Sequence, residues 1–66
     1  MNLKRIKLQQ LRKENDLTQK EVAEMLGITS DYYGMIERGE RTGPLEIAKK
    51  ISDLFGTTVE DIFFTY

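Results

Sequence analysis

Turn-forming residues divide this chain into five short segments, and this division limits the fold more than any other feature. The breaks fall at Asn15–Asp16, Gly27, Gly39, Pro44 and Gly56, residue types that interrupt helices and form turns. Within the segments apolar residues recur at helical spacing, and no segment alternates as a half-buried strand does. The pattern predicts an all-α fold, a compact five-helix bundle.

The second and third segments carry the most specific local signals. Thr18 and Glu21 match a capping box, in which the threonine hydroxyl accepts from the Glu21 amide and the carboxylate reaches back. Gly27 can adopt the left-handed conformation that ends this helix. Thr29 then suits the N-cap of a further helix over residues 30–38.

These two helices meet the demands of a helix-turn-helix, in which a short turn containing glycine joins two crossing helices. Ala23 is small enough to let the helices cross closely, Gly27 allows the turn, and Ile28 can seal the corner. The second and third helices are therefore predicted to form this motif.

The other three helices are expected to supply most of the remaining core. Their predicted apolar positions are Leu3, Leu8 and Leu11 in the first, Leu45, Ala48, Ile51, Leu54 and Phe55 in the fourth, and Val59, Ile62 and Phe63 in the fifth. Pro44 suits the first turn of the fourth helix, and either Thr57 or Thr58 can cap the fifth.

Composition excludes several classes of function. The 66 residues suffice for one small domain, expected to span residues 1–66. Cysteine and histidine are both absent, which removes disulfides, thiolate nucleophiles, zinc sites and the commonest general base. We therefore expect no enzyme, no cofactor and no metal. No stretch approaches the roughly 20 apolar residues of a membrane span, so a cytoplasmic protein is expected.

Charge is distributed unevenly, although the net charge is only −1. Residues 1–20 hold six bases and two acids, whereas residues 44–66 hold two bases and four acids. Such asymmetry can orient a protein on a polyanion; ordinary solvated helix faces would explain it equally well.

The two faces of the predicted helix 30–38 differ in character. At about 100° per residue, Tyr33 and Ile36 fall together on the inward face, flanked by Tyr32. The outward positions are Ser30, Asp31, Gly34, Met35 and Arg38. Glycine costs roughly 1 kcal/mol in a helix interior, so Gly34 indicates a close approach by another group. The alternative is simple tolerance of an exposed surface.

The stretch from Leu8 to Phe63 resembles the lambda-repressor-like (Cro/repressor-type, XRE) helix-turn-helix family. The most specific matches are Leu17-Thr18-Gln19, Ala23 with Leu26-Gly27-Ile28, Ile36-Glu37-Arg38-Gly39, and Gly56 followed by Val59-Glu60-Asp61-Ile62-Phe63. The resemblance implies a five-helix fold that binds specific sequences of duplex DNA through the major groove. Such proteins are usually transcriptional repressors or regulators.

The resemblance also implies roles for individual residues. Base contacts would fall to Ser30, Asp31, Gly34 and Met35. Contacts to the DNA backbone would fall to Thr18, Gln19, Thr29, Tyr32, Arg38, Arg41 and Thr42. Arg12 and Glu37 match an internal ion pair that ties the first helix to the end of the third.

Three residues depart from the family pattern. Gly34 and Met35 replace a common serine and a polar, often amide, side chain, so amide readout of adenine is lost there. Tyr33 replaces a branched aliphatic residue, and its hydroxyl, which needs a partner, is expected to lean toward the protein's edge.

Asp31 has two explanations that can hold together. A carboxylate near a helix N-terminus interacts favourably with the helix dipole. It can also accept from the exocyclic amine of cytosine.

A domain of this size is expected to bind DNA as a homodimer on a two-fold site. Phe64 and Tyr66 form a candidate dimer surface, unless this terminus folds back on its own core. Three functions stay open: a small prokaryotic or phage repressor, a controller protein of a restriction–modification system, and an antitoxin-like protein-interaction module with secondary DNA binding.

Overall fold

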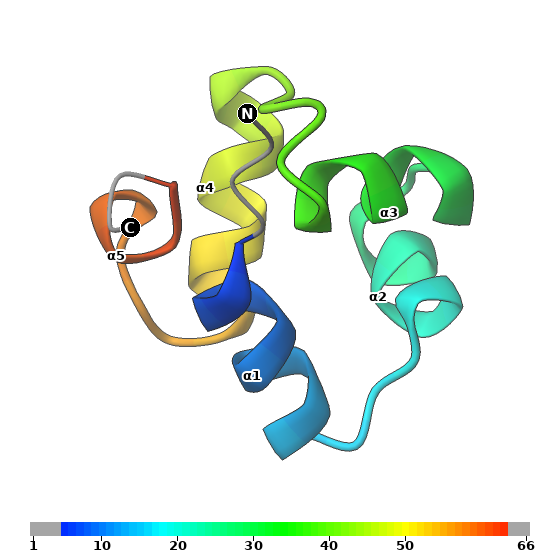
Figure 1. Ribbon diagram of the computed structural model, residues 1–66, viewed down its shortest axis with the longest axis horizontal. Coiled ribbons are helices and arrows are strands. Elements are labelled where there is room, and N and C mark those ends of the chain that lie inside the picture. Colours follow the sequence, from blue (N-terminus) through cyan, green and yellow to red (C-terminus); the bar gives the residue numbers. More distant parts are fainter. Residues whose placement is uncertain (1–4, 64–66) are drawn as a thin grey trace.

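A computed structural model describes residues 5–63 of the chain and folds them into five helices, with no strand in that range (Figure 1). The helices are α1 (Ile6–Glu14), α2 (Gln19–Leu26), α3 (Ser30–Glu37), α4 (Leu45–Leu54) and α5 (Val59–Phe63). The predicted all-α fold is confirmed. None of the described helices has the length and apolar character needed to cross a membrane.

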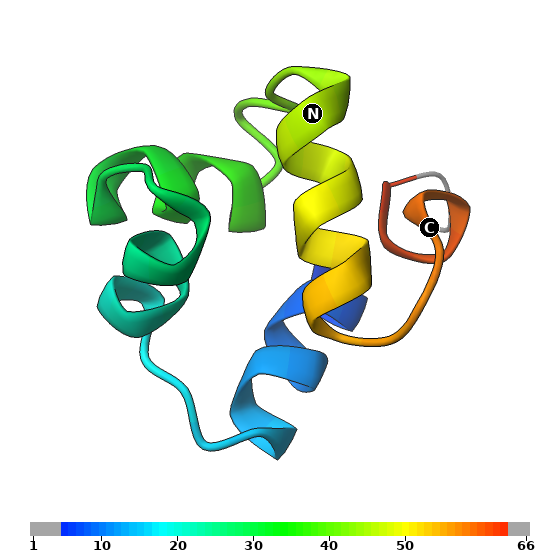
Figure 2. The ribbon, with the colours of Figure 1, turned by 180° about the vertical axis from the view of Figure 1, so that it is seen from behind.

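The α2–α3 pair lies on one side of α4 and α5 lies on the other, as both views show (Figures 1 and 2). Helix α2 packs more closely against α3 than against α4. Helix α1 contacts both α3 and α5 and so joins the two sides of the bundle. The DNA-binding elements predicted from the sequence are thus packed as a unit against the rest of the core.

Local signals set the ends of α2 and α3. Thr18 accepts from the Glu21 amide and Glu21 accepts from the Thr18 amide, which completes the predicted capping box. Gly27 has a φ of 76° and ends α2 in the left-handed conformation. The Thr29 hydroxyl accepts from the Tyr32 amide at the start of α3. These helix ends agree with the positions predicted from the sequence, because each depends only on residues close by in the chain.

The ends of α4 and α5 refine the predictions. Pro44 occupies the N-cap of α4, one position before the first helical residue. At the start of α5, the Thr58 hydroxyl accepts from the Asp61 amide. The Thr57 hydroxyl instead donates to the Asp61 carboxylate. Thr58 is therefore the capping residue of the two candidates.

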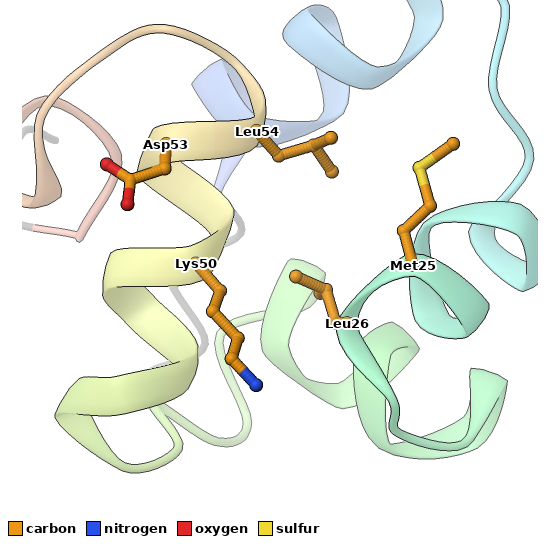
Figure 3. Close-up of a pocket in the computed structure, with 5 residues that line it drawn as sticks. All are labelled: Met25, Leu26, Lys50, Asp53 and Leu54. Carbon is orange, nitrogen blue, oxygen red and sulfur yellow. The ribbon is translucent and has the colours of Figure 1, made fainter.

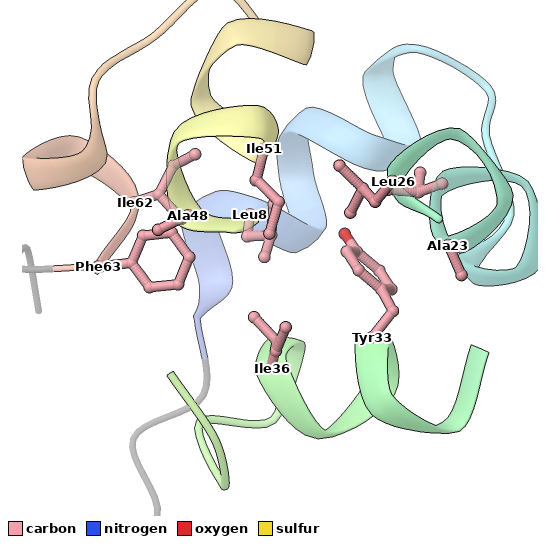
Figure 4. Packing of buried hydrophobic residues seen from close by; sticks show 10 residues of the cluster. Leu8, Ala23, Leu26, Tyr33, Ile36, Ala48, Ile51, Ile62 and Phe63 are labelled. Carbon is pink, nitrogen blue, oxygen red and sulfur yellow. The ribbon is translucent and has the colours of Figure 1, made fainter. Parts of the chain in front are cut away.

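The core collects apolar residues from all five helices (Figure 4). Its buried members are Leu8, Val22, Ala23, Leu26, Tyr33, Ile36, Ala48, Ile51, Ile62 and Phe63. The expected burial of Leu45 and Leu54 was wrong, since these side chains are 68% and 38% exposed. Both occupy end positions of α4, whereas its buried residues lie in the middle turns.

Candidate nucleic-acid interface

The helix-turn-helix predicted for α2 and α3 is present. Ala23 is buried where the helices pack together, and Ile28 is half-buried against the core at the corner. The amides of Gly27 and Ile28 donate back to the carbonyls of Glu24 and Ala23, at 3.2 and 3.0 Å. The turn is therefore tied to the last residues of α2, which determines where α3 begins.

A buried carboxylate at the end of α3 joins three helices. Glu37 is only 1% exposed, and its Oε2 accepts from Nε of Arg12 on α1 at 2.5 Å. Its Oε1 accepts from Nη2 of Arg12 at 3.3 Å and from Nε2 of Gln19 on α2 at 3.1 Å. Arg12 and Glu37 thus form the predicted ion pair, and Gln19 extends it into a network.

The charge network has electrostatic and structural consequences. The hydrogen bond to Glu37 is the main reason that the pKa of Arg12 is raised. Nη1 of the same guanidinium donates to the Leu17 carbonyl at 2.9 Å, in the segment between α1 and α2. One arginine therefore holds this connection and the end of α3 together.

The sequence predicted that Tyr33 leans toward the edge of the protein, and this prediction was wrong. Its side chain is fully buried and points from α3 into the core (Figure 4). The hydroxyl has no hydrogen-bond partner among the described residues. Burial is the main reason that the pKa of Tyr33 is raised, and the nearby Glu37 carboxylate raises it further. Five-helix packing encloses the ring because α3 faces the core at this position.

Gly34 was expected to be exposed on the outward face of α3, but two side chains of the protein cover it; its predicted base contact stays a prediction. The residue is buried. A Cβ at Gly34 would lie 3.0 Å from Nη1 of Arg38 and 3.4 Å from Oε1 of Gln19. The close approach indicated by the glycine is therefore made by the protein's own side chains. Gln19 comes from α2, so a wheel of α3 alone could not place it there.

The exposed part of α3 carries the remaining predicted base contacts. Ser30 and Asp31 are exposed in the first turn, and Met35 is half-buried. Arg38 is exposed beside them and donates from Nε to Oε2 of Glu40 at 2.6 Å. That hydrogen bond is the main reason that the pKa of Arg38 is raised, with a smaller contribution from Asp31. The surface thus combines acids, a base and a thioether.

The residues predicted to contact the DNA backbone lie at the starts of α2 and α3, within α3 and in the loop after α3. Thr18 and Thr29 are exposed at the N-termini of α2 and α3, where their hydroxyls cap the helices. Arg41 and Thr42 are exposed in the loop after α3. Tyr32 is half-buried, and its hydroxyl oxygen lies 3.1 Å from the position of a Cβ on Gly43. Tyr32 therefore packs against this loop.

Sequence reasoning missed Arg5 as a residue of this region. Its guanidinium donates to the carbonyls of Ile36 and Arg41 and to the hydroxyl of Thr42. The hydrogen-bond partners lie more than 30 positions away in the chain, so no local pattern marks the contact. One signal was available, since no basic residue occupies the last turn of α3.

A separate groove of about 450 Å³ lies between α2 and α4 (Figure 3). Met25 and Leu26 line it from α2, and Lys50, Asp53 and Leu54 line it from α4. None of these residues belongs to the predicted DNA contacts. Phe64 and Tyr66, the predicted dimer surface, lie outside the described residues.

Comparison with known proteins agrees with this geometry. A family model described as Helix-turn-helix matches residues 8–62. The chain belongs to this helix-turn-helix family. It is 39% identical over 57 residues to an uncharacterized HTH-type transcriptional regulator of Methanocaldococcus jannaschii, covering 86% of each chain.

Two further relatives have more specific names. Control protein C.MunI of a Mycoplasma species is 40% identical over 58 residues, covering 86% of this chain and 78% of the relative. The cryptic phage CTXphi transcriptional repressor RstR of Vibrio cholerae is 32% identical over 56 residues. That match covers 85% of this chain and 50% of the repressor. No solved structure matches the chain significantly.

Proposed function

We propose that this protein is a transcriptional regulator that binds specific sequences of duplex DNA, with α3 in the major groove. The observation that carries the proposal is the anchoring of α3 by Glu37, which Arg12 and Gln19 hold from two other helices. A reading helix needs a fixed pose, because base-edge hydrogen bonds require defined geometry. The same helix leaves Ser30 and Asp31 exposed.

Phosphate contacts would position α3 on the duplex. The N-termini of α2 and α3 offer free amides near Thr18 and Thr29, a favourable place for a phosphate. Gln19 is half-buried, and its amide nitrogen is already bonded to Glu37. We expect Gln19 to contribute to DNA binding by positioning α3 as well as by contacting a phosphate directly. Arg38 and Arg41 supply exposed positive charge nearby.

The names of the relatives support a regulatory role for this chain. Two of them are named as a transcriptional regulator and a transcriptional repressor, and a third as a control protein. We expect a single domain over residues 1–66 that acts in the cytoplasm as a homodimer without catalytic activity. Deleting residues 64–66 should weaken dimerisation, and unchanged sedimentation at high concentration would contradict that role for Phe64 and Tyr66.

Selection from random duplex DNA tests the proposed function directly. We expect one sequence to be enriched and bound about 10³-fold or more tightly than random duplex. The logarithm of its affinity should fall linearly with the logarithm of salt concentration, since each neutralised phosphate contributes a slope of roughly −0.9. Failure to enrich any sequence at low salt would favour the alternative function, an antitoxin-like module whose first partner is another protein.

Asp31→Ala tests whether α3 reads bases. Removing this carboxylate should raise affinity for random DNA, because it relieves repulsion from phosphates, and should relax preference at one base pair. Glu14→Ala removes the same charge from an exposed position at the end of α1 and serves as the matched control. Equal losses of affinity by Asp31→Ala on the selected and random duplexes would contradict the base contact.

A further inference from the structure

The C-terminal end of α3 depends on a distant arginine. This helix has no basic residue in its last turn and ends at the acidic Glu37, an unfavourable combination with the helix dipole. The backbone amide of Arg5 donates to the Glu37 carbonyl at 2.9 Å. Nη1 of Arg5 donates to the Ile36 carbonyl at 2.6 Å. Arg5 therefore caps the end of α3 with both its backbone and its charge.

The same guanidinium reaches the loop that follows α3. Nη1 of Arg5 donates to the Arg41 carbonyl at 3.1 Å, and Nη2 donates to the Thr42 hydroxyl at 3.3 Å. Because one planar group bonds both the helix end and the loop, the distance between them is set by the guanidinium. Arg41 and Thr42 are the exposed residues of this loop predicted to contact phosphates.

The guanidinium of Arg5 also packs against an aromatic ring of α5. Its guanidinium carbon lies 4.6 Å from the centre of the Phe63 ring, a distance at which a cation is attracted to an aromatic face. Phe63 is buried in the core. The arginine is thus positioned before any DNA is bound.

We propose that Arg5 is the positioning residue of the phosphate-contacting loop and keeps Arg41 and Thr42 in register with α3. This inference rests on the proposed function of α3 and its loop. The role favours an arginine, because its rigid planar fork carries donors on separate nitrogens that here reach the helix end and the loop together, whereas the three donors of a lysine ammonium all lie on one nitrogen at the end of a flexible chain. Arg5→Lys therefore separates geometry from charge.

The first test uses the free protein and does not depend on DNA binding. In Arg5→Lys, backbone ¹⁵N order parameters in residues 40–43 should fall from about 0.85 to below about 0.7, while those of α2 stay unchanged. Lys7→Gln, an exposed change on α1, is the control and should alter neither. Unchanged order parameters in the loop would overturn the proposal.

A second variant keeps this test decisive if Arg5→Lys does not fold. Thr42→Val removes one acceptor of the arginine without touching α3. The loop should again become more mobile, and a loop as rigid as in the original chain would overturn the proposal.

The second test measures DNA binding in a double-mutant cycle on the selected duplex. Arg5→Lys should weaken binding about tenfold, which equals about 1.4 kcal/mol, and should make the salt slope about one unit less steep. In an Arg41→Ala background the same change should weaken binding less than threefold, because the loop's charged contact is already lost. Equal effects in the two backgrounds would show that Arg5 acts only on overall folding and would overturn the proposal.

The two tests also separate this inference from the proposed function. A mobile loop in Arg5→Lys, together with no enriched sequence for the original chain, would support the positioning of the loop by Arg5 and refute sequence-specific DNA binding. A rigid loop with normal selection of DNA would refute the role of Arg5 alone.

Discussion

Arg12→Met is the substitution that tests most sharply how α3 is held. Methionine keeps much of the apolar length of arginine but removes every donor. Glu37, 1% exposed, would lose the guanidinium and retain only the amide of Gln19 among its present side-chain donors. The bond from Arg12 to the Leu17 carbonyl would also be lost. The variant therefore leaves a buried carboxylate without its countercharge.

The size of the effect follows from the burial of the pair. Removing one partner of a buried ion pair typically destabilises a protein by about 3–5 kcal/mol. The remaining Gln19 bond favours the lower end, about 3 kcal/mol, since hydrogen bonds to charged groups contribute about 1.5–3 kcal/mol. A domain of 66 residues has a total stability of roughly 3–10 kcal/mol. The substitution should thus remove from about a third to all of the folding free energy.

Urea denaturation followed by circular dichroism at 222 nm measures the loss. With a slope of about 1 kcal/mol per molar urea, the midpoint should fall by about 3 M, or the chain should be unfolded without urea. The double variant Arg12→Met/Glu37→Met should recover much of the stability, because a well-packed apolar pair can replace a buried ion pair. A single variant within about 1 kcal/mol of the original chain would refute the reasoning, as would a double variant no better than the single.

Three further substitutions test individual features of α2 and α3 by thermal unfolding. Gly34→Ala should stabilise the fold by up to about 1 kcal/mol, because the exposed guanidinium of Arg38 can move from the added Cβ; a lower midpoint would show that it cannot. Gly27→Ala should destabilise by about 1–2 kcal/mol, since the φ of 76° disfavours a side chain, and an unchanged midpoint would contradict this. Tyr33→Phe should leave stability unchanged or raise it by up to about 1 kcal/mol, because it removes a buried hydroxyl that has no hydrogen-bond partner within residues 5–63. A clear loss would show that the hydroxyl is satisfied.

Local chemistry explains what the sequence predicted well. The capping box of Thr18 and Glu21 and the left-handed Gly27 are set by residues within one turn of each other. The bounds of α2 and the start of α3 could therefore be predicted without knowledge of the rest of the fold. The Arg12–Glu37 pair came instead from family resemblance, since 25 positions separate its members.

Contacts between distant segments explain what the sequence missed. A helical wheel gives the direction in which Gly34 faces but not that Gln19 of α2 covers it. The same wheel placed Tyr33 inward, yet the depth of its burial depends on how all five helices pack. Arg5 lies in no recognisable motif and acquires its role only where the start of α1 meets the loop after α3.

The anchoring of α3 has a consequence for how this domain can change over evolution. Its inward residues are committed to the core and to the Glu37 network, whereas Ser30 and Asp31 are exposed. Surface substitutions away from special features usually change stability by less than about 0.5 kcal/mol. New side chains can therefore be tried at these two positions while the helix keeps its pose. Under the proposed function, a change of DNA target need not pass through a poorly folded intermediate.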